Sequence, residues 1–306
     1  MGAGAQDFVD RDASDRELKA VMLRHLAART SAAKADRGQI VAVLSPTPGD
    51  ESRDLGVNIG CALASARPND GVILIDLSLP ASDAGIALGL DLQYCVSDAV
   101  KEISRLDRAL LDGALARCPR SGLYVLPLAR HGDDEGWAVD MQDLRALLEI
   151  LQSLYEVVVI DCGPFSRNED VIGLPGANAV FFLSCNQRFT SIKAAGELLR
   201  SVRAARSSSI DPVVAIHEFA PTLTPGFDEI RVALGAGAAV RLSARWAELA
   251  DSVNRGVPLA LAGPSDYADE LKRCLAALDL LPDGQPAGAA EPQMRVWARK
   301  LMGILP

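Results

Sequence analysis

Residues 40–77 read IVAVLSPTPGDESRDLGVNIGCALASARPNDGVILIDL, and this stretch decides the fold. An apolar run at 40–45 ends in a polar turn, and a second apolar run at 72–77 closes the stretch. The segment between them has helical spacing, with its buried stripe at Leu55, Ile59, Ala62 and Leu63. The order strand, loop, helix and strand predicts a right-handed crossover between two parallel strands.

The same alternation continues along the chain. Further apolar runs lie at 123–128, 157–161, 179–185, 212–219 and 239–243. They are nearly continuous in Val, Ile and Leu, which is typical of strands covered on both faces. Helical periods separate them, most clearly at Asp140–Tyr155 and Ser191–Arg206. The sequence therefore predicts an α/β fold with a mostly parallel sheet and helices on both faces, whose ligands bind at the carboxyl ends of the strands.

Composition limits the function classes. The chain has 306 residues, a net charge of −9 and no apolar run long enough to span a membrane. Its N-terminus lacks the basic start and apolar core of a secretory signal, so we expect a cytoplasmic protein. The acidic balance argues against DNA binding, and the locally basic helix near Arg188–Arg206 is better interpreted as a solvated face.

Six cysteines are scattered without any C-x-x-C pair: Cys61, Cys95, Cys118, Cys162, Cys185 and Cys274. This pattern favours buried thiols of a reducing compartment over disulfides. Metal ligands would be clustered, and the three histidines do not lie near a cysteine pair, so we expect no metal site.

Four segments are expected. Residues 1–37 form an N-terminal helix and linker, 38–280 the α/β domain, 281–293 a flexible linker and 294–306 a short basic amphipathic helix. The N-terminal helix is either a dimer or partner contact or a segment packed on the core.

Two strand ends carry a resemblance to a known superfamily. VILIDL ends at Asp76, and VVVIDCGP places Asp161 at the end of another strand. These resemble the second aspartate motif and the Walker B motif of ParA/MinD-type P-loop ATPases. RLDRALLDGALARCPRSGLYVLPLA at 105–129 and VNRGVPL at 253–259 resemble the TadZ/CpaE family of Tad (Flp) pilus assembly. The resemblance covers roughly residues 38–280.

The phosphate loop departs from the superfamily pattern K-G-G-x-G-K-[ST]-[ST]. Aligned on Asn58, the degenerate loop consists of Thr47, Pro48, Gly49, Asp50, Glu51, Ser52, Arg53 and Asp54. Thr47 and Ser52 stand at the two lysine positions. A P-loop surrounds phosphate with backbone N–H groups and a lysine, whereas Pro48 removes a donor and three carboxylates would repel the ligand. The strand at 212–219 ends in His217-Glu218, where the superfamily carries an Asn that reads adenine.

We therefore interpret the chain as a non-catalytic scaffold without ATP or Mg²⁺, in which Asp76 and Asp161 remain as caps of helices and turns. A cation site made of these carboxylates is the alternative role. An active ATPase switch with Arg53 replacing lysine is the alternative function, with ATP and Mg²⁺ as its cofactors. A tyrosine-kinase-like protein would share the fold, but the tail carries no tyrosine cluster.

The C-terminal segment presents an apolar half and a basic half. The apolar residues are Met294, Trp297, Leu301, Met302, Ile304 and Leu305, and the basic residues are Arg295, Arg299 and Lys300. Such a helix binds a membrane surface, a partner protein or its own domain. The resemblance implies a homodimer, partners among the Tad secretion ATPase and the inner-membrane platform proteins, and a peripheral, polar position at the inner membrane.

Overall fold

A computed structural model describes residues 37–46, 53–68, 71–78, 82–130, 140–163, 169–175, 179–205 and 211–282. The N-terminal helix, nearly all of the linker at 281–293 and the C-terminal helix predicted above lie outside the described residues. The middle of the phosphate loop, residues 47–52, also lies outside them.

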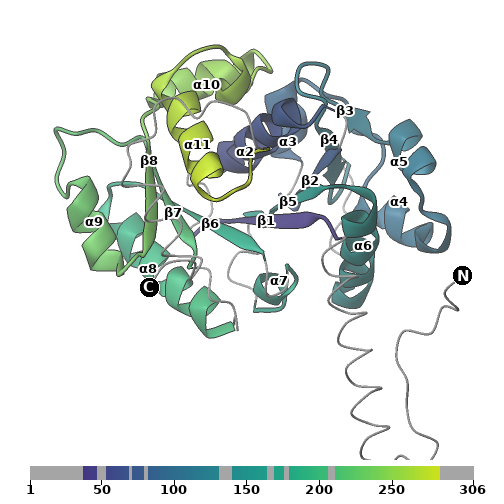
Figure 1. Cartoon of the computed structure of the whole chain (residues 1–306), viewed down its shortest axis with the longest axis horizontal. Coiled ribbons are helices and arrows are strands. Elements are labelled where there is room, and N and C mark those ends of the chain that lie inside the picture. Colours follow the sequence, from purple (N-terminus) through teal and green to yellow (C-terminus); the bar gives the residue numbers. More distant parts are fainter. Residues whose placement is uncertain are drawn as a thin grey trace, which may run out of the picture. The chain divides into compact units, whose positions relative to one another are not determined.

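The described residues contain one eight-stranded sheet with the order β3-β4-β2-β5-β1-β6-β7-β8 (Figure 1). The strands are β1 (Gln39–Leu44), β2 (Val72–Asp76), β3 (Ala116–Arg117), β4 (Tyr124–Pro127), β5 (Val157–Asp161), β6 (Val180–Cys185), β7 (Val213–His217) and β8 (Ala238–Leu242). All neighbours pair in parallel except β3 and β4. The predicted fold class is confirmed, and the seven predicted strands are present with ends that differ by at most two residues.

Helices cover both faces of this sheet (Figure 1). One face carries α2 (Arg53–Ala66), α3 (Asp83–Leu88), α10 (Trp246–Asn254), α11 (Asp266–Ala277) and the 3₁₀ turn η4 (Leu259–Leu261). The other carries α4 (Val96–Lys101), α5 (Arg108–Ala114), α6 (Met141–Leu154), α7 (Glu169–Gly173), α8 (Phe189–Ala205) and α9 (Phe227–Leu234). The 3₁₀ turn η1 (Ile103–Arg105) follows α4.

Alternate strand residues supply the two cores. In β1, Val41 and Val43 pack toward α2, whereas Ile40, Ala42 and Leu44 pack toward the opposite helices. Both sets are nearly inaccessible to solvent. Burial on both faces explains why the sequence of this strand is continuously apolar rather than alternating.

Asn58 joins α2 to the 3₁₀ turn η4, which follows the last strand of the sheet. Its side-chain amide donates to the carbonyl oxygen of Asp54 at 2.7 Å, and its Oδ1 accepts from the backbone N–H of Ala260 at 2.8 Å. The residue is buried, so both bonds replace water contacts that folding removes. α2 is therefore tied to η4, which sets the direction in which its N-terminus points.

Among the helices that the structure describes, none combines the length and the apolar character that a membrane span requires.

Candidate functional site

The two aspartates singled out by the sequence lie side by side. Asp76 ends β2 and Asp161 ends β5, and the two residues are register partners in adjacent parallel strands. The N–H of Leu77 donates to the carbonyl oxygen of Asp161 at 3.0 Å, which holds the strand ends together. Both side chains are buried, with 1% and 6% of their surface exposed. Because β2 and β5 are adjacent parallel strands, their final residues lie side by side at the carboxyl edge of the sheet.

The Asp76 carboxylate is enclosed by donors from the chain that follows it. Its Oδ1 accepts from the Ser78 backbone N–H at 2.9 Å and from the Ser78 hydroxyl. Its Oδ2 accepts from the Ser82 hydroxyl at 2.5 Å and from the Ala84 backbone N–H at 2.9 Å. A carboxylate has about four acceptor positions, so these donors occupy its normal capacity. We call this group of Asp76, Ser78, Ser82 and Ala84 the Asp76 cage.

The cage also begins α3. Ser82 is the N-cap residue of that helix, because its side chain accepts from the Gly85 N–H at 3.2 Å. The Asp76 carboxylate then takes a further N–H of the first turn, at Ala84. A negative charge at a helix N-terminus is stabilising. The geometry is that of a carboxylate capping a turn and a helix. Sequence reasoning missed both serines, although serine and small residues directly after a strand-ending aspartate are a capping signal.

Asp161 lies against the beginning of α2. A Cβ at Gly56 would come within 2.7 Å of Asp161 Oδ2, so only glycine allows the helix to approach this closely. The backbone N–H of Gly163 donates to Asp161 Oδ1 at 3.0 Å, and Gly163 has a left-handed φ of 45°. The carboxylate is thus held between a tight turn and the first turns of the helix that follows the phosphate loop.

Only the end of the degenerate phosphate loop is described. Arg53 and Asp54 form the first turn of α2, and Asp54 is half-buried. Burial, together with the charge of Asp54, raises the pKa of Tyr267 in α11. The remaining loop positions of the sequence analysis, Thr47, Pro48, Gly49, Asp50, Glu51 and Ser52, lie outside the described residues.

A hollow of about 370 Å³ lies at the carboxyl ends of β6 and β7. Its lining residues are Asn186, Gln187, Arg188, Glu218, Leu223 and Thr224. Glu218 directly follows β7 and has a left-handed φ of 49°, which is uncommon for a residue with a side chain. His217, at the preceding position, is buried. The position that the sequence analysis assigned to an eroded adenine contact therefore borders an open hollow.

Polar contacts from the β6 end shape this hollow. Gln187 Oε1 accepts from the Ala220 N–H at 2.7 Å, and its Nε2 donates to the carbonyl oxygen of Pro225 at 3.1 Å. Asn186 Oδ1 accepts from the Arg188 N–H at 3.0 Å. Two large apolar side chains stand next to these residues in the chain: Phe189 is 76% exposed and Leu223 is 55% exposed. Sequence reasoning singled out Arg188 only as part of a basic helix, and it missed Phe189 and Leu223.

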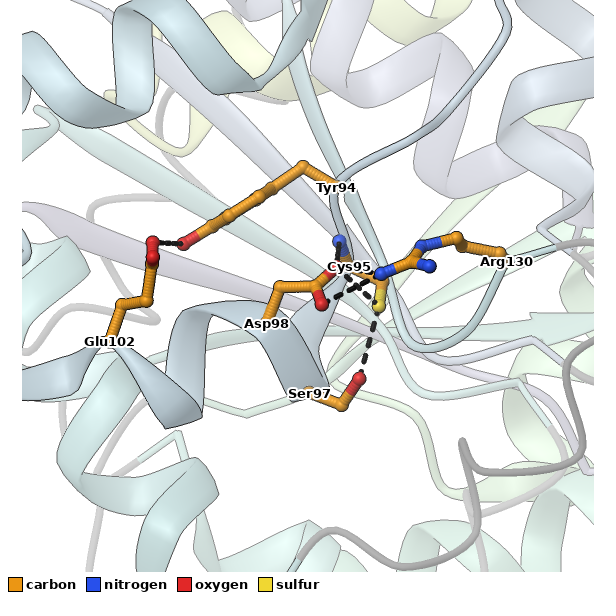
Figure 2. A network of polar contacts seen from close by, with 6 residues as sticks. All are labelled: Tyr94, Cys95, Ser97, Asp98, Glu102 and Arg130. Carbon is orange, nitrogen blue, oxygen red and sulfur yellow. Dashed lines mark hydrogen bonds and ion pairs between the residues drawn. The ribbon is translucent and has the colours of Figure 1, made fainter.

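A second polar cluster joins Arg130, Asp98 and Cys95 (Figure 2). It lies near the Asp76 cage, because Arg130 and Ser82 line the same hollow. Arg130 Nη2 donates to both carboxylate oxygens of Asp98 at 2.7 Å, and Asp98 Oδ2 accepts from the Cys95 N–H and thiol at 3.0 Å. Burial acts to raise the pKa of Asp98, but the bonds from Arg130 and Cys95 outweigh it and lower that pKa. Arg130 and Ser82 line a hollow of about 350 Å³.

Tyr94 extends this cluster toward α4. Its hydroxyl donates to Glu102 Oε2 at 3.1 Å (Figure 2). Burial is the main cause that raises the pKa of Tyr94, and the Glu102 carboxylate raises it further. The C-terminal end of the loop between α3 and α4 is therefore fixed to the region of α4. Sequence reasoning missed this cluster, because Asp98 and Arg130 are 32 positions apart with no motif to join them.

The six cysteines are free and buried, as the sequence predicts. Within the described ranges, no three His, Cys, Asp or Glu side chains come together in a way that could hold a metal ion.

Neither the protein-family models nor the curated proteins contain a significant match to this sequence. Solved structures do match. The ParA family ATPase from Chlorobium tepidum TLS aligns at 20% identity with a TM-score of 0.66, covering 77% of this chain and 96% of that chain. The MinD protein from Pyrococcus horikoshii OT3, complexed with Mg-ADP, aligns at 16% identity with a TM-score of 0.59, covering 76% and 93%.

The MinC:MinD cell division protein complex from Aquifex aeolicus aligns at 18% identity with a TM-score of 0.57, covering 87% of this chain and 96% of that chain. These identities are too low to transfer activity, but the coverage includes nearly the whole of each matched chain. The described part of this chain therefore has the fold of the ParA/MinD-type P-loop ATPases.

Proposed function

We propose that this chain is a non-catalytic localisation scaffold of ParA/MinD type, acting as a dimer in the assembly of a Tad (Flp) pilus or secretion apparatus. The observation that carries the absence of catalysis is the Asp76 cage. A carboxylate that accepts from four internal donors has no vacant position for a hydrated cation unless the start of α3 is taken apart.

The loop composition supports the same conclusion. No lysine lies between Lys34 and Lys101, so neither lysine of the phosphate loop pattern is present. Asp50, Glu51 and Asp54 instead add negative charge where the phosphates would lie. Each pair of like charges about 4 Å apart costs about 4 kcal/mol at an effective dielectric constant of 20. Arg53, one position beyond the lysine slot, offsets part of this repulsion.

Nucleotide binding tests the proposal directly. A fluorescent ATP analogue is titrated with the purified full chain in the presence of Mg²⁺, and ATP hydrolysis is followed as phosphate release. We expect no saturable binding below about 1 mM and no hydrolysis above the protein-free rate. Micromolar affinity that is lost in Asp161→Ala would overturn the scaffold proposal.

The alternative is an active switch in which Arg53 replaces the lysine. The position of Asp161 favours it, since this carboxylate lies against the first turns of α2, next to the loop. In that case Arg53→Ala abolishes ATP binding, whereas Arg120→Ala, an exposed arginine on the β3–β4 turn, does not. If neither substitution changes a measured affinity, the active-switch alternative is wrong.

Assembly with Tad components is tested by co-purification. We expect the full chain to retain the Tad secretion ATPase or an inner-membrane platform protein of the same system. A structure of this fold in complex with a partner protein is known in the MinC:MinD complex from Aquifex aeolicus. If the chain binds neither protein at micromolar concentration, the pilus assignment is wrong, whereas the fold assignment is unaffected.

The proposed membrane contact uses the C-terminal segment 294–306. One short helix binds lipid weakly, and a dimer presents two of them. We expect the full chain to sediment with anionic liposomes, and a chain lacking residues 292–306 to remain in the supernatant. Equal sedimentation of the two chains would exclude the membrane role and leave a protein contact for this segment.

A further inference from the structure

The hollow at the β6 and β7 ends lies beside exposed apolar side chains. Leu223 belongs to its lining and is largely exposed. Phe189, the residue after the lining residue Arg188, is the most exposed large apolar side chain of the described residues. An apolar segment that covered these side chains would remove them from water, which is favourable.

Hydrogen bonds within the described chain fix the walls of this hollow. Gln187 joins the end of β6 to the loop after β7, because its amide group bonds to the Ala220 N–H and to the Pro225 carbonyl oxygen. Its Nε2 also lies 3.4 Å from the carbonyl oxygen of Leu223, so the backbone that carries this exposed leucine is held in place. Glu218 keeps its left-handed φ of 49°, and such backbone conformations cluster at binding sites. A site that is formed before binding loses little free energy to ordering.

Acidic side chains stand at the hollow. Glu218 belongs to its lining, and the exposed Glu229 lies in the first turn of α9. Glu229 Oε2 accepts from the Gly226 N–H at 2.7 Å, two residues after the lining residue Thr224, so this carboxylate is close to the hollow. Arg188 is the basic residue of the lining. The surface therefore favours an apolar segment with a positive charge.

The C-terminal tail, residues 294–306, has this combination of properties. Its sequence gives one apolar half, which includes Trp297 and Leu301, and one basic half. It contains three basic residues and no acidic one. Both the apolar character and the charge of the tail are thus complementary to the hollow and its surroundings.

The tail can reach the hollow from the end of the described chain, at Pro282. α11 begins at the carboxyl edge of the sheet, because the N–H of Ser243, directly after β8, donates to Glu270 Oε2 of this helix at 2.8 Å. The helix has 12 residues, a length of about 18 Å, and packs along β8 away from that edge. Residues 283–293 span up to about 36 Å when extended, which exceeds the return along α11 together with the width of two strands, about 10 Å.

We propose that the C-terminal tail docks on its own domain, with Trp297 in the hollow at the β6 and β7 ends and the apolar half of the tail over Phe189 and Leu223. A short linker gives the tail an effective concentration in the millimolar range, so a contact with a millimolar dissociation constant is occupied about half of the time. The docked tail covers the surface on which a partner would bind, and it therefore competes with that partner.

Disulfide trapping in the full chain tests the docking without lipid or partner. Ala298→Cys places a thiol next to Trp297, and Thr224→Cys places one in the lining of the hollow without removing an exposed apolar side chain. The double variant is oxidised with diamide at micromolar concentration and digested without reductant. We expect a linked peptide pair that contains positions 224 and 298, in a product with the mobility of one chain. The six native cysteines are buried and react more slowly.

The matched control replaces Thr224→Cys by Ile86→Cys. Ile86 is 57% exposed on α3, which follows β2, and three strands separate β2 from β7 in the sheet. A tail that moves freely over the surface would link to both positions alike. A docked tail should link to position 224 at least tenfold faster than to position 86.

Two substitutions in the tail test which of its halves makes the contact. Trp297→Ser, added to the pair at positions 224 and 298, removes the side chain assigned to the hollow and should lower the rate of linking at least tenfold. Val296→Ser removes an apolar side chain that helical spacing places on the basic half, and it should leave the rate unchanged.

Three outcomes would overturn the proposal. The first is equal linking at positions 224 and 86. The second is a linked product that contains only two chains, which would assign the hollow to the tail of a second copy. The third is an equal effect of Trp297→Ser and Val296→Ser.

The relation of docking to the membrane rests on the function proposed above. The same apolar residues would contact lipid, so anionic liposomes should lower the linking of positions 224 and 298 several-fold. Linking that persists in a chain that does not sediment with liposomes would refute the membrane contact and support the docking. Absence of linking without lipid would refute the docking, whatever the sedimentation shows.

Discussion

The two halves of the carboxyl edge of the sheet differ in how their polar groups are used. At the β2 and β5 ends, the Asp76 cage directs four donors at one buried carboxylate. At the β6 and β7 ends, a hollow of about 370 Å³ opens beside Phe189 and Leu223, which are largely exposed. In the first half the Asp76 carboxylate finds its partners within the chain, whereas in the second half two large apolar side chains are exposed beside a hollow.

This difference bears on whether the strand-end carboxylates act in nucleotide chemistry or stabilise the fold. In a nucleotide-binding protein, carboxylates at strand ends need vacant positions to act on a metal ion or a water molecule. Here the Asp76 carboxylate stabilises the start of α3, so its burial contributes to folding. Phe189 and Leu223, which we call the apolar rim, are largely exposed, and this makes the hollow beside them a candidate contact surface. Under the scaffold proposal, the β6 and β7 ends are therefore where we expect a partner contact.

Replacing Asp76 should have the largest effect. Asp76→Ala removes the acceptor of the Ser78 and Ser82 hydroxyls and of two backbone N–H groups, which are left buried without partners. We expect a loss of about 3 kcal/mol in the free energy of unfolding, measured by urea denaturation. Asp91→Ala, an exposed carboxylate in the next loop, should change it by less than about 0.5 kcal/mol. An unchanged stability of Asp76→Ala would mean that the cage is not structural and would favour the catalytic alternative.

A charge at the apolar rim should weaken self-association. If the dimer forms through the β6 and β7 ends, Phe189→Asp places a carboxylate in the interface and raises the dimer dissociation constant about tenfold or more. Sedimentation equilibrium would then report a mass moving toward the 32.4 kDa of one chain. Val232→Asp on α9, where the parent side chain is 69% exposed, is the matched control and should leave the constant unchanged. Equal effects of the two substitutions would place the interface elsewhere.

The fold could be predicted from the sequence because the burial of a strand is visible in its own residues. Strands covered on both faces need continuous apolar runs, and every long run of Val, Ile and Leu became a strand. β3 escaped prediction because two residues cannot show a period. The capped helix α6 matched its pattern within one residue, since Asp140 caps it and its leucines recur with helical spacing.

The candidate site was predictable only in part. The strand-ending aspartates could be placed together, because parallel strands end at one edge and each residue closes its strand. Their surroundings could not, since the Asp76 cage depends on how the chain turns after β2. The left-handed Glu218 likewise reflects a turn geometry that its residue type does not favour.

The smallest effect is expected at Asp98, in the polar cluster near the Asp76 cage. Its pKa is lowered in the folded state, so the stability it contributes is present above the ordinary Asp pKa and is lost as pH falls through the folded value. Since the Arg130 side chain is 43% exposed, solvent weakens the pair. We expect Asp98→Asn to lower the free energy of unfolding by about 1 kcal/mol at pH 7, and the difference from wild type to shrink below about pH 4. A double-mutant cycle with Arg130→Met isolates the pair, and a coupling energy that stays constant from pH 7 to pH 3 would show that ionisation of Asp98 does not contribute.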